Sequence, residues 1–259
     1  MKRTEKRKKR VFSDSGIMFK RCMITSLRNP EAFITALLLP AIMMWFFGSV
    51  FGSAMDVGAY NYIDFIVPGI ILQVVAQGTQ ATAINVNNDM TKGIMDRFRS
   101  MAITKSSVLT GHVFSSVIRS IITTAISIGI AIAIGFRPQA GFSDWLIISG
   151  ILILFIFAIT WIAVLCGLVA KDAASAGPMM VLLLLLPFVS SGFVPTETMS
   201  RGLRAFAENQ PMTPIIDSLR ALMLNNPTGD ALPIALIWCI GMIVVAFVVS
   251  MQVYKRKLS

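Results

Sequence analysis

The stretch WLIISGILILFIFAITWIAVLCGLVA, residues 145–170, contains no charged side chain. An apolar helix needs about 20 residues to cross the hydrocarbon core of a bilayer, so this stretch predicts a membrane-spanning helix. The composition of the whole chain agrees, with 55% hydrophobic residues, 14% charged residues and a mean hydropathy of +0.74. Soluble domains average about 25% charged residues. A soluble chain of 259 residues is therefore excluded, and an integral membrane protein is predicted.

Further apolar stretches lie on both sides of this one, and together they predict six spans. The expected spans are residues 32–53, 62–88, 108–135, 145–170, 178–194 and 231–253. The fifth is short for a bilayer crossing and contains Pro187. The predicted fold class is all-α, with a basic cytoplasmic tail at residues 1–29 and one six-helix membrane domain at residues 30–259.

The basic residues predict the orientation of these spans. With six spans, both termini lie on the same side of the membrane. Of the 23 Lys and Arg residues, 18 fall on that side, four fall on the other, and Arg119 falls within a span. Cytoplasmic segments carry the excess of basic residues, so we expect both termini in the cytoplasm beneath a bacterial plasma membrane. The run KRTEKRKKR, residues 2–10, is expected to contact anionic lipids rather than nucleic acid.

Two cytoplasmic segments outside the spans are amphipathic. Residues 13–28 have an apolar and a basic side, which predicts a helix in the headgroup plane; a disordered tail is the alternative. Residues 94–102 place apolar and charged side chains on opposite faces of a short helix. This helix either lies on the inner leaflet or docks a soluble partner, and the pattern alone does not decide. The candidate docking residues are Ile94, Asp96, Arg97, Phe98, Arg99 and Met101.

The long outer connection, residues 195–230, is predicted to hold two short helices. Leu203 and Phe206 indicate the first. The second, opened by Pro214, is indicated by the apolar residues Ile215, Ile216, Leu219, Leu222 and Met223. Such pieces beyond a short span are typical of re-entrant or surface-lying helices. Asp217 and Arg220 are expected to pair on the surface of the second helix. The candidate residues of this outer element are Glu197, Phe206, Asp217 and Arg220.

Polar residues follow one face of two expected spans. The second span carries Gln73, Gln77, Gln80, Asn87 and Asn88, and the third carries His112, Ser116, Arg119, Thr123 and Ser127. Polar groups in hydrocarbon must find partners. They either bond neighbouring helices together or line a hydrophilic pathway, and both interpretations stay open. The candidate pathway residues are Gln73, Gln77, Gln80, Asn87, Ser116 and Arg119.

Arg119 is the one basic residue expected within a span. Its charge costs roughly 3 kcal/mol at the bilayer centre on insertion scales. We therefore expect it to pair or to extend toward the cytoplasm, with Asp89 and Asp172 as candidate partners. His112 lies near the same edge and is expected to be structural.

The sequence carries no recognisable catalytic or metal-binding motif. It has one histidine, and its three cysteines, at positions 22, 166 and 239, are too far apart for a metal-ligand spacing. A GxxxxGK[ST] phosphate loop and a GxSxG elbow are both missing from the sequence. We therefore expect no catalysis, no bound cofactor and no metal. Any uphill movement of a substrate would draw its energy from a partner or a gradient.

Four stretches carry a resemblance to a known family. They are RNPEAFITALLLPAIMMWFFGSVFG (28–52), YIDFIVPGIILQ (62–73), GIMDRFRSMAITKSSVLTGH (93–112) and SSGFVPTETMSRGLRAFAENQPMTPIIDSLRAL (190–222). In this order they resemble the membrane subunits of type-2 ABC exporters, most closely the daunorubicin-resistance and polyketide-antibiotic branch. Within these stretches, DRFRS (96–100) and the pattern FVP-E-M in FVPTETM (193–199) are fairly specific for this family. One departure is Gln210-Pro211, where relatives usually have Asn-Pro.

The resemblance implies six membrane helices and two permease halves per complex. Each half would bind a cytoplasmic ATPase subunit, which would hold the ATP and magnesium. The N-terminal interfacial helix and residues 93–102 would meet that ATPase, which favours docking for the second segment. The outer helices map onto residues 196–224, and spans one, two and five would border the pathway. Whether the second permease is an identical copy or a close paralogue stays open.

The implied function is the membrane half of an ATP-driven exporter of an amphiphile such as a drug, antibiotic, lipid or peptide. Related permeases export lipid-linked polysaccharides, which is the alternative substrate class. A non-transporting scaffold or intramembrane hydrolase is a hypothesis from another class, but a hydrolase needs a nucleophile and a base at membrane depth. A gradient-driven carrier usually places ionisable residues near mid-membrane, where only Arg119 is a candidate.

Overall fold

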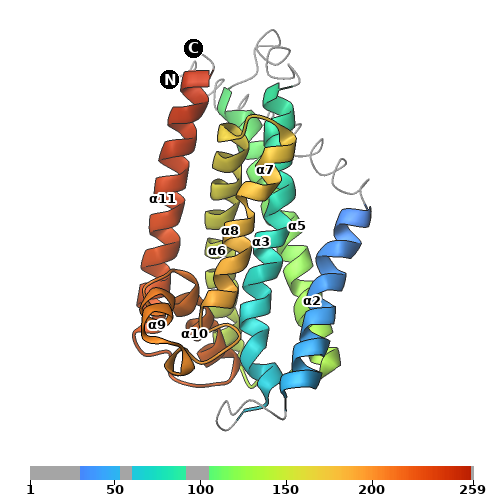
Figure 1. The fold of residues 1–259 in the computed structure, drawn as a ribbon, viewed down its shortest axis with the longest axis vertical. Coiled ribbons are helices and arrows are strands. Elements are labelled where there is room, and N and C mark those ends of the chain that lie inside the picture. The colour runs from blue at the N-terminus through green and yellow to red at the C-terminus, as the bar shows by residue number, and fades with distance from the viewer. Residues whose placement is uncertain (1–29, 53–59, 92–104, 258–259) are drawn as a thin grey trace.

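The computed structural model describes residues 30–52, 60–91 and 105–257, and the regular structure of these residues is helical. Figure 1 shows long helices lying side by side along one axis, with the short helices α9 (Arg201–Glu208) and α10 (Met212–Met223) at one end. We call this end the α10 end. The opposite end, where α11 (Ala231–Lys257) finishes, is called the Lys257 end.

Five long helices agree closely with expected spans. They are α2 (Pro30–Phe51), α3 (Tyr62–Thr91), α5 (Lys105–Ile134), α6 (Phe142–Val169) and α11. Among the described residues, α3, α5, α6 and α11 are long and apolar enough to cross a membrane. Two further apolar segments are shorter, Leu37–Phe51 within α2 and Ala173–Val189.

The fifth expected span, residues 178–194, is wrong in its bounds and in its continuity. The chain there forms α7 (Ala173–Met179), α8 (Val181–Leu185) and the 3-10 helix η1 (Leu186–Val189). The segment starts earlier than expected because Asp172 caps it: its side chain accepts a hydrogen bond from the Ser175 amide at 2.8 Å. Pro178 and Pro187 remove amide donors from the segment, which accounts for its broken form. At about 1.5 Å per residue, Ala173–Val189 spans about 25 Å, which is short of a hydrocarbon core of about 30 Å.

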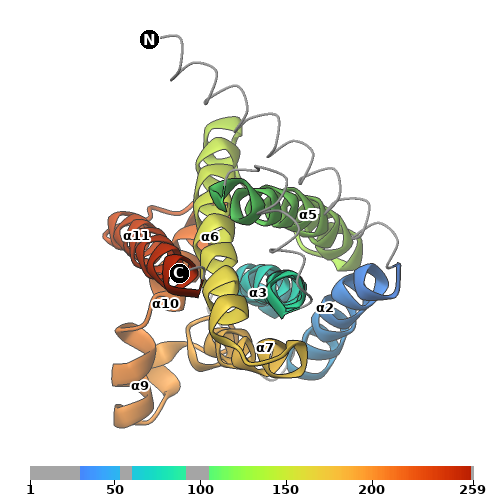
Figure 2. The same ribbon diagram turned by 90° about the horizontal axis from the view of Figure 1, so that it is seen from above.

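Helix α3 forms the centre of the bundle. Figure 2 shows it surrounded by α2, α5, α6 and α7. Of its most apolar stretch, 83% is buried inside the molecule, against 17% for α11. A glycine allows the close approach of α6, because a Cβ on Gly167 would meet the Ala83 carbonyl oxygen and lie 3.0 Å from Val86 Cβ. Helix α3 is therefore the element against which the others are positioned.

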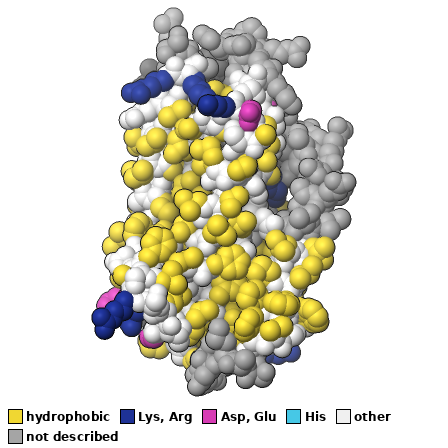
Figure 3. All heavy atoms as spheres, in the orientation of Figure 1, with side chains coloured by type: hydrophobic (Ala, Val, Ile, Leu, Met, Phe, Trp, Pro, Cys, Tyr) yellow, Lys and Arg dark blue, Asp and Glu magenta, His cyan; other side chains and the backbone are white. Residues whose placement is uncertain are grey.

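The flanks of the bundle are apolar and the ends are charged. Figure 3 shows hydrophobic side chains over the middle of one face and basic and acidic side chains near the two ends. Large apolar side chains are exposed along α2 and α11, among them Ile42, Trp45, Ile237 and Val245. Helices with exposed apolar flanks are those that face lipid. This surface agrees with a multi-pass membrane protein.

The outer connection forms η2 (Thr196–Thr198), α9 and α10. The predicted apolar residues of α10 are all buried, namely Ile215, Ile216, Leu219, Leu222 and Met223. Leu203 and Phe206 of α9 are exposed. The predicted interfacial helix at residues 13–28 and the predicted docking helix at 94–102 lie outside the described residues.

Candidate functional site

The polar face of α3 bonds to its neighbours. Gln80 Nε2 donates to the Gly177 carbonyl oxygen of α7 at 3.2 Å. Asn87 Nδ2 donates to the carbonyl oxygens of Gly167 at 3.1 Å and Ala170 at 2.8 Å. These acceptors lie at the end of α6, where helix carbonyls lack partners within the helix. Gln80 therefore joins α3 to α7, and Asn87 joins α3 to the end of α6.

Two other predicted pathway residues on α3 differ in burial. Gln73 is buried, and its side-chain oxygen has no hydrogen-bond partner within the described part of the chain. Gln77, one turn further, is half-buried, as are Gln80 and Asn88. Helix α3 therefore keeps a partly exposed polar edge between its buried faces.

Arg119 lies near the middle of α5 and turns toward α3. Its Nη2 donates to the Gly78 carbonyl oxygen at 2.9 Å and to Thr82 Oγ1 at 3.0 Å. Thr82 Oγ1 donates to Ser116 Oγ at 2.8 Å, and Ser116 Oγ lies 3.5 Å from Thr160 Oγ1 of α6. Oxygen acceptors solvate the guanidinium charge, as a cation at membrane depth requires. These contacts join α3, α5 and α6 at one level of the bundle.

The two acidic residues predicted as partners of Arg119 have described contacts elsewhere. Asp89 Oδ2 lies 3.0 Å from His112 Nε2, and both side chains are buried. This contact links α3 to α5 near the Lys257 end and gives His112 a structural role. Asp172 is exposed and caps α7. The oxygens of Gly78 and Thr82 are two Arg119 contacts that the sequence interpretation did not include.

Arg220 forms the densest polar contact at the α10 end. Its Nε donates to the Phe65 carbonyl oxygen at 3.1 Å, its Nη1 donates to Asp217 Oδ1 at 2.7 Å, and its Nη2 donates to the Ser191 carbonyl oxygen. The guanidinium carbon lies 3.8 Å from the centre of the Phe65 ring, a cation–π contact. Asp217 Oδ1 also accepts from Ser191 Oγ at 2.6 Å. We call Phe65, Ser191, Asp217 and Arg220 the α10 clasp.

The α10 clasp confirms one prediction and corrects another. Asp217 and Arg220 are paired, but Arg220 does not lie on the helix surface as expected, because only 15% of its side chain is exposed. Its burial lowers the pKa of the guanidinium to about 10, so Arg220 stays protonated at neutral pH. Burial also raises the pKa of the Asp217 carboxyl, which the Arg220 charge opposes. The clasp fixes the turn after η1 and helix α10 to the first turns of α3.

Further contacts close the same junction. Tyr62 Oη donates to the Phe193 carbonyl oxygen at 2.9 Å, and the Phe188 and Phe193 rings stack with centres 4.6 Å apart. A Cβ on Gly69 would lie 2.8 Å from the Gly192 Cα atom, which brings the two backbones into direct contact. The α10 end of α3 is therefore closely packed against residues 190–193.

The remaining outer candidates lie apart from the clasp. Glu197 is exposed in η2. Phe206 is 51% exposed on α9, beside an exposed ion pair between Arg204 and Glu208. Helix α9 projects from the bundle in Figure 2, and its large apolar residues Leu203 and Phe206 stay exposed in the described part of this chain, whereas Ala207 is buried.

The structure brings together Gln80, Asn87, Ser116 and Arg119 as interhelical contacts, and Asp217 with Arg220 as the clasp. The six predicted docking residues, Ile94 to Met101, lie outside the described residues. Sequence reasoning missed Thr82 and Thr160, although polar residues in apolar spans are a usable signal. It also missed Phe65 and Ser191, which act largely through backbone oxygens and leave no such signal. Among the described residues, no group of His, Cys, Asp or Glu is suited to a metal ion.

The sequence of this chain is similar to those of known membrane proteins. The pattern of the ABC-2 type transporter family matches residues 15–224. A daunorubicin resistance ABC transporter permease protein of Streptomyces coeruleorubidus is 30% identical over 240 residues, which cover 92% of this chain and 84% of that protein. A probable doxorubicin resistance ABC transporter permease protein of Mycobacterium tuberculosis (strain ATCC 25618 / H37Rv) is 24% identical over 228 residues, which cover 86% and 81%.

Proposed function

Because this chain belongs to the ABC-2 type transporter family, we propose that it forms half of the pathway through which an amphiphilic drug or antibiotic is exported. Membership makes it a transmembrane subunit of an ABC exporter with a partner ATPase. The observation that carries the substrate class is the similarity, over most of both chains, to permeases named for daunorubicin and doxorubicin resistance.

The energy for transport is proposed to come from the partner ATPase. That subunit would hold ATP and magnesium, and this chain would bind no cofactor and catalyse no reaction. The proposed contact is the helix at residues 94–102, with Phe98 as its apolar anchor and Arg97 and Arg99 at its rim. The family match at residues 15–224 includes both this helix and the outer helices. A buried aromatic residue is a frequent source of interface binding energy.

The proposed membrane arrangement has both termini in the cytoplasm, so that the α10 end faces outward. The helix α2 and the α7–η1 segment would complete six crossings, and α9 and α10 would be re-entrant or surface-lying. A second permease, identical or paralogous, would supply the other half of the pathway. The partly exposed polar edge of α3, at Gln77 and Asn88, is the surface we assign to that pathway. Contacts with nucleic acid play no part in this function.

The α10 clasp suggests how export would proceed. It holds α10 and residues 190–193 against α3, and we propose that this contact closes the outer end of the subunit. Release of a substrate outward would require these elements to separate. We propose that ATP binding, transmitted through residues 94–102, shifts the subunit toward a state in which the clasp is open.

Co-purification followed by an ATPase assay tests the proposal. The chain and its ATPase subunit are co-expressed, purified by a tag on this chain and reconstituted in lipid. We expect the ATPase to be retained and its hydrolysis rate to rise with daunorubicin. Stimulation by a lipid-linked polysaccharide but not by the drug would favour the alternative substrate class. If no ATPase is retained and no substrate stimulates hydrolysis, the transport function is wrong and a scaffold is favoured.

A further inference from the structure

The segment after α6 is interrupted at Met180, between α7 and α8. In a continuous α-helix the Gly177 carbonyl oxygen would accept a hydrogen bond from the Val181 amide. Here it accepts from the Met180 amide at 3.0 Å, in a tighter turn that ends α7. The two prolines of the segment lack amide donors of their own, but Val181 keeps its amide. The break therefore falls at a bond that neither proline removes directly.

A side chain of α3 contacts the carbonyl at this break. Gln80 Nε2 donates to the Gly177 carbonyl oxygen at 3.2 Å. A glycine permits this approach, because a Cβ on Gly177 would lie 3.3 Å from Gln80 Nε2 and 3.5 Å from Ile84 Cδ1. A side chain that inserts into the hydrogen-bond ladder of a helix is a known cause of a kink. Gln80 therefore binds the acceptor that the Val181 amide would otherwise use, and it stabilises the broken form.

The two sides of this contact are held with different firmness. Helix α3, which carries Gln80, is the buried centre of the bundle. None of the five residues of α8 is buried within the described structure, and Leu182 and Leu185 are 71% and 50% exposed. A segment with few buried contacts rearranges at low cost. Loss of the Gln80 bond would therefore move α8 and leave α3 in place.

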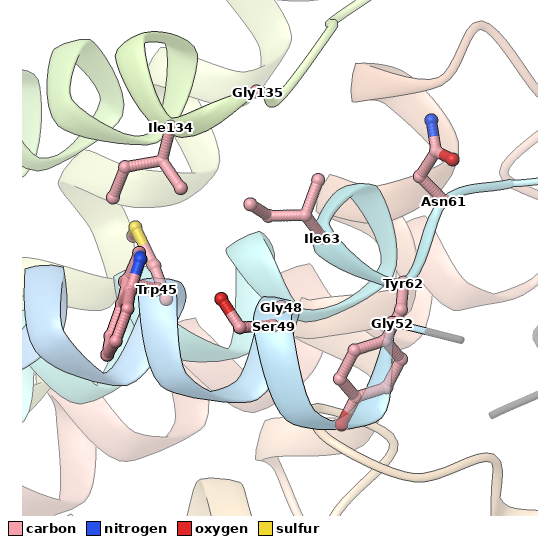
Figure 4. Close-up of a pocket in the computed structure, with 10 residues that line it drawn as sticks. Trp45, Gly48, Ser49, Gly52, Asn61, Tyr62, Ile63, Ile134 and Gly135 are labelled. Atoms are coloured by element: carbon pink, nitrogen blue, oxygen red, sulfur yellow. The ribbon is translucent and has the colours of Figure 1, made fainter. Parts of the chain in front are cut away.

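Gln80 is half-buried on the polar edge of α3, close to Gln77. Both side chains are uncharged amides. The amide NH₂ donates to oxygen acceptors, so a carbonyl oxygen of a substrate on this edge would compete with the Gly177 carbonyl for it. The crevice in Figure 4, lined by Trp45 and Ile63 among others, lies roughly 25 Å away along α3 and takes no part in this contact.

We propose that Gln80 senses the exported substrate and controls the break between α7 and α8. A ketone or quinone oxygen of the substrate would accept the hydrogen bond of Gln80 Nε2, which would release the Gly177 carbonyl. The Val181 amide would then bond to Gly177, and α7 and α8 would join in one helix. The substrate shifts this equilibrium by as much as it prefers the joined form. The inference rests on the proposed export function and adds a specificity, because the substrate then needs an uncharged oxygen acceptor.

Hydrogen exchange of the amides at residues 181–183 measures the break in the purified full-length chain, without the ATPase. Gln80→Met removes the donor and keeps the length of the side chain. It should slow exchange of these amides roughly fivefold, the factor that corresponds to one net hydrogen bond. Gln210→Met is the matched control, because Gln210 Nε2 also donates to carbonyl oxygens of this segment, at Leu186 and Val189, beyond the break. It should not slow exchange at residues 181–183.

Daunorubicin should slow the same exchange in the wild type and should have no further effect in Gln80→Met. In the reconstituted complex with the ATPase, Gln80→Met should raise basal hydrolysis and remove most of its stimulation by the drug. Equal exchange in the wild type and Gln80→Met would overturn the proposal.

A purely binding role of Gln80 predicts a different result. Gln80→Met would then raise the half-maximal drug concentration but leave the maximal hydrolysis rate and the exchange unchanged, which would also overturn the proposal. If the drug fails to stimulate the wild-type complex, the export function itself is refuted, and substrate sensing with it. The exchange of Gln80→Met would still decide whether Gln80 stabilises the break.

Discussion

Replacing Arg220 by alanine should open the α10 clasp and uncouple the subunit. The substitution removes hydrogen bonds to Phe65, Ser191 and Asp217 together with the cation–π contact. Truncating one partner of a buried ion pair costs about 3–5 kcal/mol. Asp217 keeps 38% of its side chain exposed and is partly solvated, so we expect a smaller loss of about 2–3 kcal/mol. For a chain of this size, that loss lowers the midpoint of thermal unfolding by roughly 5–10 °C.

The assay is thermal unfolding of the purified chain in detergent, paired with drug-stimulated ATPase activity of the complex. Arg204→Ala is the control, because Arg204 also pairs with a carboxylate on its own outer helix but is exposed. It should leave the midpoint unchanged. Arg220→Ala should raise basal hydrolysis and reduce its stimulation by drug. Adding Asp217→Asn to Arg220→Ala should restore part of the lost stability. Equal midpoints for Arg220→Ala and Arg204→Ala would refute the reasoning.

Three further predictions follow from the same structure. Phe98→Ala should weaken the binding free energy of the ATPase by about 2 kcal/mol in a pull-down titration while leaving membrane insertion intact. Unchanged ATPase retention and unchanged transport would instead indicate that residues 94–102 only anchor the chain to lipid. Ser200→Cys, exposed at the start of α9 and placed on a cysteine-free background, should react with impermeant maleimide only from outside whole cells, and labelling only from inside would reverse the orientation. Gly69→Ala should lower the free energy of thermal unfolding by about 1–3 kcal/mol, because its Cβ would collide with the Gly192 backbone. Gly202→Ala is the control and should leave that free energy unchanged, because its Cβ meets no atom within 4 Å.

Hydropathy located most of the long helices because a bilayer selects length and apolarity directly. The ends of α3 and α11 at Tyr62 and Ala231 match the expected starts of their spans. The fifth segment was misplaced because its limits depend on other physics. The Asp172 cap extends it backward, and the prolines break it before the expected end at residue 194. The mean hydropathy of a stretch of about 20 residues does not register a helix cap or a single proline, so it does not locate the ends of this segment.

The candidate site was predictable in its residue types but less so in its partners. Some residues of the polar stripes bond to other helices, as Asn87 and Arg119 do, and a pathway lining by these stripes stays a prediction. Their acceptors are mostly backbone carbonyls, which every residue carries, so no residue type in the sequence marks them. Arg220 was expected on a surface because its spacing from Asp217 describes one helix alone. Its burial depends on Phe65, which lies far away in the sequence and is brought close only by the fold.

ATP-dependent drug transport in inverted membrane vesicles tests the central claim most directly. Vesicles containing this chain together with its ATPase subunit should accumulate daunorubicin when ATP is supplied. The accumulation should disappear when either chain is omitted, when ATP is replaced by a non-hydrolysable analogue, or when Phe98→Ala removes the proposed ATPase contact. A proton ionophore should leave it unchanged. Accumulation that needs a proton gradient and not ATP, or that proceeds without the ATPase subunit, would contradict an ATP-driven exporter.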